Sequence, residues 1–126
     1  MAKSRVLYIE DYPVVQIMYV EVLRKHFDVD VASDGKDALE KIKNSRYDII
    51  LLDLLLPQVS GVEFLREYQK GSHKQDSKTK VVVLSDFDNP ETRKEVHALG
   101  VHEYWIKVEN TPYALIERMQ KLLANG

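Results

Sequence analysis

Acidic, hydroxyl and amino side chains follow four short apolar runs of this sequence. They are Glu10 with Asp11, then Asp53, Ser85 and Lys107. Carboxylates that share one pocket repel one another, and a hard cation relieves that repulsion. Oxygen ligands without histidine or cysteine nearby suit Mg²⁺, with Mn²⁺ as an alternative. A carboxylate nucleophile, a divalent cation, an amine and a hydroxyl are the groups that phosphoryl transfer uses, because that reaction depends on positioning and charge neutralisation.

The apolar runs predict the frame that must hold these groups. Strands are expected over 5–9, 29–31, 47–52, 81–84 and 101–106. Helices are expected over 14–26, around 38–42 and 62–68, from 90 to about 99, and from 112 to about 123. Strict alternation of strand and helix predicts an α/β fold with parallel strands, right-handed crossovers and helices on both faces. In such a sheet, ligands bind beyond the carboxyl ends of the strands, which is where the polar groups fall.

Two of the expected helices differ in how they should be anchored. The helix over 14–26 carries apolar residues on more than one face, which predicts a well-buried helix. The helix after Asn89-Pro90 has few apolar residues besides Val96 and Leu99, which predicts weak attachment to the sheet. Gly100 is a plausible stop for it.

The composition restricts the class of protein. A chain of 126 residues without internal repeats predicts one domain over 1–126. There is no cysteine, so a disulfide framework is excluded. Eighteen basic residues against twenty acidic ones argue against nucleic-acid binding. No segment resembles a signal peptide or is long enough to span a membrane, so a cytoplasmic location is expected.

Four motifs occur in order along the chain. They are Glu10-Asp11, Asp53-Leu54-Leu55-Leu56-Pro57 with Gly61, Leu84-Ser85, and Tyr104-Trp105-Ile106-Lys107. Together they resemble the receiver domain of two-component response regulators over essentially the whole chain. The resemblance implies a flavodoxin-like fold, in which a doubly wound five-stranded parallel sheet has the order 2-1-3-4-5 and five helices cover both faces.

The resemblance also implies a role for each matching residue. Asp53 accepts a phosphoryl group from a phosphohistidine on a sensor histidine kinase or a histidine phosphotransfer protein. Lys107 and Ser85 bind the phosphoryl oxygens. The implied ligands of Mg²⁺ are Glu10, Asp11, Asp53 and the backbone carbonyl of Leu55.

Activation is implied to move two side chains. Ser85 approaches the phosphate, and Tyr104 swings inward behind it. The face built from the fourth helix, the fifth strand and the fifth helix then changes shape, and a downstream protein recognises it. The same face is compatible with a homodimer.

Four residues differ from the usual family pattern. Val108 stands where the family usually has proline after a cis peptide bond, and a non-proline cis bond costs roughly 3 kcal/mol. Asp86 stands where a small residue is usual, and its charge is expected to slow small anionic phosphodonors. Leu55 and Phe87 occupy the positions that tune hydrolysis of the acyl phosphate, and their bulk predicts a long-lived phosphoryl state.

The motifs also distinguish this function from related ones. An aspartyl phosphatase of the haloacid-dehalogenase type needs an aspartate two residues after the nucleophile, where this chain has Leu55. A flavodoxin-like cofactor binder needs a glycine-rich loop after the first strand, which is lacking. A pseudo-receiver that binds proteins without being phosphorylated remains the alternative. The protein is not expected to be an enzyme, although it would catalyse its own phosphorylation and dephosphorylation. The sequence ends soon after the fifth helix, so a stand-alone receiver with protein contacts as its output is expected.

Overall fold

A five-stranded parallel sheet forms the centre of the computed structural model, which describes residues 3–56, 60–70 and 78–125. The strands are β1 (Arg5–Ile9), β2 (Asp28–Ala32), β3 (Ile49–Leu52), β4 (Lys80–Ser85) and β5 (Glu103–Ile106). Their order is β2-β1-β3-β4-β5, with every neighbouring pair parallel. The predicted fold class and strand order are confirmed.

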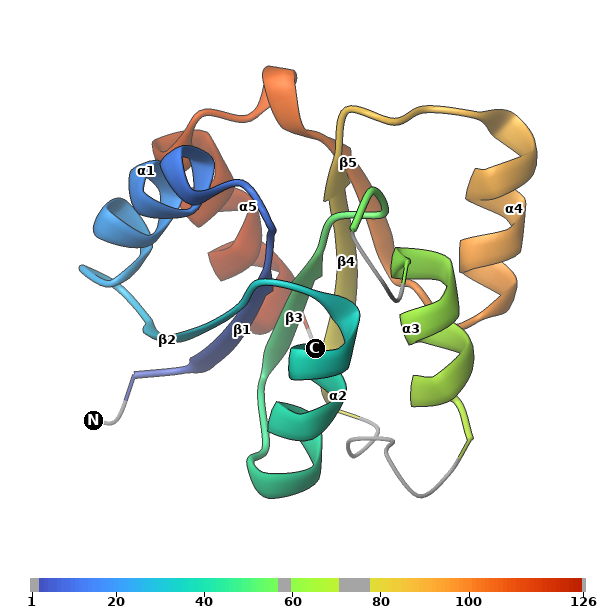
Figure 1. The fold of residues 1–126 in the computed structure, drawn as a ribbon. Helices are drawn as coiled ribbons and strands as arrows, with labels where there is room; N and C mark the ends of the chain where they lie inside the picture. The colour runs from blue at the N-terminus through green and yellow to red at the C-terminus, as the bar shows by residue number, and fades with distance from the viewer. Residues whose placement is uncertain (1–2, 57–59, 71–77, 126) are drawn as a thin grey trace.

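Within the described ranges, four α-helices connect the strands, and a short 3₁₀ turn and a fifth α-helix follow β5. They are α1 (Pro13–Leu23), α2 (Gly35–Asn44), α3 (Gly61–Tyr68), α4 (Pro90–Ala98), the turn η1 (Lys107–Glu109) and α5 (Pro112–Ala124). In Figure 1, α1 and α5 cover one face of the sheet, and α2, α3 and α4 cover the other. Asn89 and Thr111 cap α4 and α5, because each side chain accepts a hydrogen bond from a backbone N–H in the first turn of its helix.

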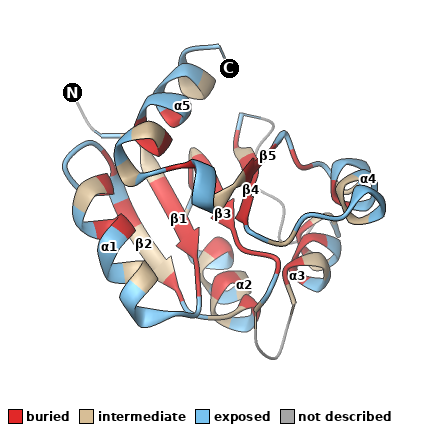
Figure 2. Ribbon diagram, turned by 90° about the horizontal axis from the view of Figure 1, so that it is seen from above, coloured by how far each residue is buried: buried red, intermediate tan, exposed pale blue. Residues whose placement is uncertain are grey.

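Alternating strand residues build two separate cores. In β1, Leu7 and Ile9 point toward the side of α2, α3 and α4, whereas Val6 and Tyr8 point toward α1 and α5. This follows from the two-residue period of a strand. Figure 2 shows the buried strands in the middle and the exposed outer sides of the helices. The sheet is therefore covered on both faces and leaves its strand ends free for chemistry.

The burial of α1 corrects the prediction from the sequence. Only Tyr19, Val20 and Leu23 are buried in this helix. Val14 and Ile17 are 68% and 66% exposed. Apolar residues on several faces of α1 indicate an uncovered surface, and the expectation of a well-buried helix was wrong.

The prediction for α4 is confirmed. Val96 is its one buried residue. The helix ends at Ala98, and its C-cap Leu99 is followed by Gly100 with a positive φ of 94°, a conformation that favours glycine. With so small an apolar contact, α4 is the least anchored of the five α-helices.

Candidate functional site

The carboxyl ends of four strands meet at one edge of the sheet. Glu10 follows β1, Asp53 follows β3, Ser85 ends β4 and Lys107 follows β5. The Asp53 N–H donates to the Ile9 carbonyl across the sheet at 3.1 Å, which fixes the backbone of the aspartate beside β1. The parallel topology thus places four of the predicted site residues in one pocket.

The Asp53 side chain accepts hydrogen bonds through both of its carboxylate oxygens. It is only 7% exposed. Its Oδ1 accepts hydrogen bonds from the Ser85 hydroxyl at 2.8 Å and from the Leu55 N–H at 3.1 Å. Its Oδ2 accepts from the Lys107 ammonium at 2.9 Å. Three donors converge on this carboxylate, so the pocket is organised to bind negative charge at that position.

Lys107 joins two of the carboxylates. Its ammonium donates to Asp53 and also makes a very short contact to Glu10. Burial lowers the pKa of Lys107, but the hydrogen bonds to Glu10 and Asp53 outweigh that effect and raise the pKa above its ordinary value. The lysine is therefore a permanent positive charge in the pocket.

Glu10, Asp11 and Asp53 form the acidic part of the site. One oxygen of each carboxylate lies within 4.8 Å of the others. Burial, followed by the charge of Asp53, raises the pKa of Glu10, and the bonds to Lys107 act in the opposite direction. Glu10 also accepts the Tyr12 N–H at 3.2 Å, whereas Asp11 is exposed. A set of closely spaced carboxylate oxygens without nitrogen or sulfur fits a hard divalent cation, so these three residues match the chemistry of Mg²⁺.

Gly61 allows the chain to pass close beneath the pocket. Its N–H donates to the Leu54 carbonyl at 3.1 Å. A Cβ at this position would lie 2.5 Å from the Leu54 Cα and 2.7 Å from the Asp53 carbonyl oxygen. Glycine is therefore needed at this position, because any side chain would overlap the backbone of Asp53 and Leu54. Pro57, the remaining part of the motif, lies outside the described residues.

The two predicted switch residues both lie inward. The Ser85 side chain is fully buried against Asp53, and Tyr104 is 9% exposed. The Tyr104 hydroxyl donates to the Phe87 carbonyl. Arg93 of α4 lies 4.3 Å from the centre of the Tyr104 ring and pairs with Asp88 at 2.6 Å. Tyr104 thus connects the loop after Ser85 to α4, and the movement of both side chains stays a prediction.

The four residues that depart from the family pattern surround the same site. Leu55 is 60% exposed, while Phe87 is half-buried and packs against the core on the side of α2, α3 and α4. The Asp86 carboxylate accepts the Val108 N–H at 2.8 Å. No peptide bond within the described ranges is cis, so the bond between Lys107 and Val108 is trans.

Sequence reasoning missed two residues that support the Lys107 loop. The Tyr19 hydroxyl donates to the Asn110 carbonyl at 2.7 Å and to the Lys107 carbonyl at 3.4 Å. The Asn110 side-chain amide donates to the Ile106 carbonyl at 2.8 Å. In the sequence, Tyr19 is one of many apolar residues in the segment that forms α1. Nothing in the sequence pairs it with a loop 91 residues away.

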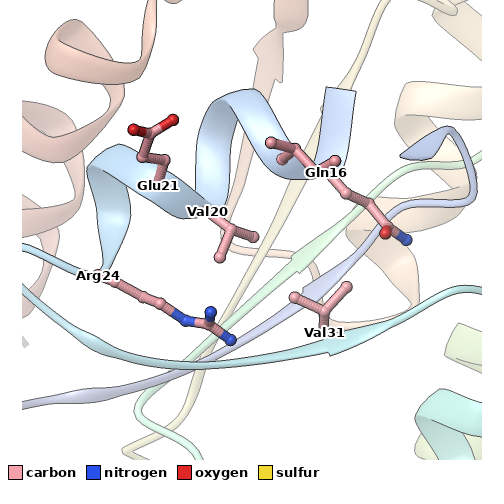
Figure 3. Close-up of a pocket in the computed structure, with 6 residues that line it drawn as sticks. Gln16, Val20, Glu21, Arg24 and Val31 are labelled. Carbon is pink, nitrogen blue, oxygen red and sulfur yellow. The ribbon is translucent and has the colours of Figure 1, made fainter. Parts of the chain in front are cut away.

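A groove of about 500 Å³ lies between α1 and β2, away from the acidic pocket. Figure 3 shows Gln16, Val20 and Glu21 on α1, Arg24 just after its end, and Val31 on β2. Gln16 reaches the site only indirectly, through a hydrogen bond to the Glu10 carbonyl. The groove holds none of the groups that would carry out phosphoryl chemistry, so the acidic pocket is the candidate site.

Comparisons with known proteins agree with this geometry. A family model described as the response regulator receiver domain matches residues 6–120. The response regulator ArlR of Staphylococcus saprophyticus is 29% identical over 124 residues, which are 96% of this chain and 51% of that protein. ArlR of Staphylococcus aureus is 27% identical over the same length. The chain spans about half the length of these curated relatives.

Solved structures show the same fold. The chemotaxis protein CheY4 of Vibrio cholerae superposes with a TM-score of 0.86 at 28% identity, covering 97% of this chain and all of that one. The receiver domain of the sensor histidine kinase PA1611 of Pseudomonas aeruginosa superposes with a TM-score of 0.82 at 25% identity, covering 98% and 99%. That structure contains a magnesium ion coordinated in its active-site cleft.

None of the helices among the described residues has the length and apolar character that a membrane-spanning segment needs.

Proposed function

Because this chain belongs to the response regulator receiver domain family, we propose that Asp53 accepts a phosphoryl group and thereby switches a protein-binding surface. The observation that carries the proposal is the convergence of Ser85, Lys107 and the Leu55 N–H on one buried carboxylate. A structural aspartate at a strand end needs no such set of donors. The donor is proposed to be a phosphohistidine on a histidine kinase or a histidine phosphotransfer protein.

The reaction is a displacement at phosphorus. A carboxylate oxygen of Asp53 forms the new O–P bond, the P–N bond to the donor imidazole breaks, and its electron pair stays on the imidazole nitrogen. Lys107 then pairs with the added phosphoryl oxygens. Since Lys107 also contacts Glu10, it keeps one anionic partner after Asp53 has been consumed. Ser85 is already within hydrogen-bonding distance of the acceptor and donates to the new group.

A divalent cation fits this scheme. We propose that Glu10, Asp11 and Asp53 hold Mg²⁺, with the Leu55 carbonyl as a further ligand, and Mn²⁺ could substitute. The bound ion would neutralise charge on the transferring phosphoryl group. Support comes from the cluster of three carboxylates and from the magnesium-containing receiver domain of the kinase from Pseudomonas aeruginosa.

Exposed apolar side chains near the pocket suggest where the donor docks. Tyr12, Leu55 and Val108 are exposed and lie one or two residues from Asp11, Asp53 and Lys107 in the sequence. Further large exposed apolar side chains lie on α1 and α5; they are Val14, Ile17, Met18 and Tyr113. Surface patches of this kind mark protein contacts more often than chance. A donor protein that covers this rim would bring its phosphohistidine to Asp53 in the cytoplasm.

The output surface is proposed to be the face formed by α4, β5 and α5. Tyr104 of β5 contacts both the Phe87 carbonyl and Arg93 of α4. The small apolar anchor of α4 permits a shift at low cost. We propose that phosphorylation changes this face for a downstream protein target, or for a second copy of the chain.

The lifetime of the phosphorylated state is proposed to be long. Leu55 extends into solvent beside Asp53, where it would hinder the attacking water. Phe87 packs partly against the core, so Leu55 is the more direct barrier of the two. A half-life of phospho-Asp53 of only seconds would contradict this part of the proposal.

The test is incubation with acetyl phosphate, with Mg²⁺ or with a chelator, followed by intact-mass measurement. We expect one phosphoryl group per chain, formed only with the metal. Asp53→Asn is the matched control because it keeps the size and removes the nucleophile. If neither acetyl phosphate nor a phosphohistidine protein gave an adduct, the chain would be a pseudo-receiver.

A further inference from the structure

Two departures from the family pattern touch each other in this chain. Asp86 replaces the usual small residue, and Val108 replaces the usual proline. Unlike proline, Val108 has a backbone N–H, and Asp86 accepts it at 2.8 Å. A proline at position 108 would have no N–H to donate, and a small residue at position 86 would lack the carboxylate that accepts it. The contact therefore needs both substitutions, which act as a pair.

We propose that Asp86 is a positioning residue for Lys107, acting through the Val108 N–H in place of the proline. The inference rests on the proposed function of Asp53, since Lys107 matters through the reaction at that residue. The peptide unit between Lys107 and Val108 is planar, so fixing its N–H also fixes its carbonyl. Asp86 thereby sets the direction in which the Lys107 side chain leaves the backbone.

The opposite side of the same peptide unit is also held. The Lys107 carbonyl accepts the Asn110 N–H at 3.0 Å, which closes the turn η1. The Tyr19 hydroxyl of α1 approaches that carbonyl at 3.4 Å and donates to the Asn110 carbonyl at 2.7 Å. The loop is thus held by α1 on one side and by the loop after β4 on the other.

The contact also joins the two phosphoryl-binding residues. Asp86 directly follows Ser85, whose hydroxyl donates to Asp53 at 2.8 Å. Lys107, next to Val108, donates to the other oxygen of Asp53 at 2.9 Å. The hydrogen bond between Asp86 and the Val108 N–H therefore completes a closed series of contacts that includes both carboxylate oxygens of Asp53. A hydrogen bond to a charged carboxylate is stronger than a neutral one, which suits this role at an exposed position.

A purely electrostatic role for Asp86 predicts the opposite result. If its charge only repelled anionic donors, Asp86→Ala would speed the reaction with acetyl phosphate, and salt would reduce the difference. If Asp86 positions Lys107, the same variant slows the reaction at any salt concentration. Asp86→Asn separates the two ideas further, because the amide oxygen can still accept the Val108 N–H without a charge.

The experiment compares the wild type, Asp86→Ala, Asp86→Asn and a charge control, Glu109→Ala, in the same loop. The maximal phosphorylation rate and the half-saturating acetyl phosphate concentration are measured at low and high salt. We expect Asp86→Ala to lower the maximal rate about tenfold, since small misplacements of a positioned group cost this much or more. The maximal rates of Asp86→Asn and Glu109→Ala should stay within about twofold of the wild-type rate, because both variants keep an oxygen at position 86 that accepts the Val108 N–H.

A second measurement does not depend on phosphorylation. Hydrogen exchange of the Val108 amide in the unphosphorylated protein should be severalfold faster in Asp86→Ala than in the wild type. It should remain slow in Asp86→Asn. The same data show whether each variant is folded, through the exchange of amides in the central strands.

The outcomes separate the two proposals. A rate for Asp86→Ala equal to or above that of the wild type would overturn the positioning role, as would unchanged exchange at Val108. A wild type that takes no phosphoryl group would overturn the proposed function instead. In that case the exchange data alone would support or overturn the contact between Asp86 and the Lys107 loop.

Discussion

Replacement of Asp11 by asparagine should change the stability of this protein in opposite directions with and without Mg²⁺. Asp11 is the exposed member of the acidic cluster, with an oxygen within 4.8 Å of oxygens of Glu10 and Asp53. Two unit charges at 4.8 Å repel by about 0.9 kcal/mol in a medium as polar as water. Lys107 already pairs with both other carboxylates, and its charge offsets part of the repulsion. We therefore expect Asp11→Asn to stabilise the metal-free fold by about 1 kcal/mol.

Bound Mg²⁺ should make the wild type more stable than Asp11→Asn, the reverse of the metal-free case. An ion that binds only the folded state stabilises it by about 2.7 kcal/mol at a hundredfold excess over its dissociation constant. The wild type gains this stabilisation, whereas Asp11→Asn has lost a charged ligand and gains much less. The variant should be the more stable protein in chelator and the less stable one in saturating Mg²⁺.

Thermal unfolding measures the crossover directly. For a chain of this size, 1 kcal/mol corresponds to a change in melting temperature of about 4 °C. Glu117→Gln on α5 is a suitable control, since it removes an exposed acidic charge outside the cluster. If Asp11→Asn and the wild type kept the same order in both conditions, Asp11 would not be a metal ligand in a shared acidic pocket.

Three further changes test other parts of the structure. Gly61→Ala should cost about 2 kcal/mol, because its Cβ would overlap backbone atoms of the Asp53 loop; urea unfolding measures this, and an unchanged midpoint would contradict the close approach. Tyr104→Phe should cost about 1 kcal/mol by leaving the Phe87 carbonyl without its donor, and equal stability would show that this bond contributes nothing. Partial burial, followed by the charge of Lys80, lowers the pKa of His102 below 6.5. The neutral ring is therefore favoured in the fold, and stability should fall as the pH drops below 6.5. His102→Gln should flatten that pH dependence of stability. If stability fell with pH as steeply as in the wild type, His102 would not be its cause.

The general architecture could be predicted from the sequence because strand alternation and polar strand ends are local signals. The continuous apolar run before Asp53 identified a central strand, and the fold class, strand order and family resemblance are confirmed. The rule that ligands bind at the carboxyl ends of parallel strands then brought Glu10, Ser85 and Lys107 together without any coordinates.

What the sequence could not predict depends on contacts between distant segments. The pattern of α1 shows that it is apolar, but not whether another element covers Val14 and Ile17. The bond between Asp86 and Val108 joins residues 22 positions apart, and each looked like a separate exception to the family pattern. Tyr19 likewise gives no local sign that it supports the Lys107 loop. Packing partners of this kind follow from tertiary geometry, which hydrophobic periodicity does not encode.

The most direct test of the proposed function is chemical identification of the phosphorylated residue. After reaction with acetyl phosphate and Mg²⁺, borohydride reduces an aspartyl phosphate to homoserine, which peptide mass mapping can locate. We expect homoserine at position 53 of the wild type and none at position 11. Homoserine at another carboxylate, or a phosphoryl adduct that persists in Asp53→Asn, would contradict the claim that Asp53 is the acceptor.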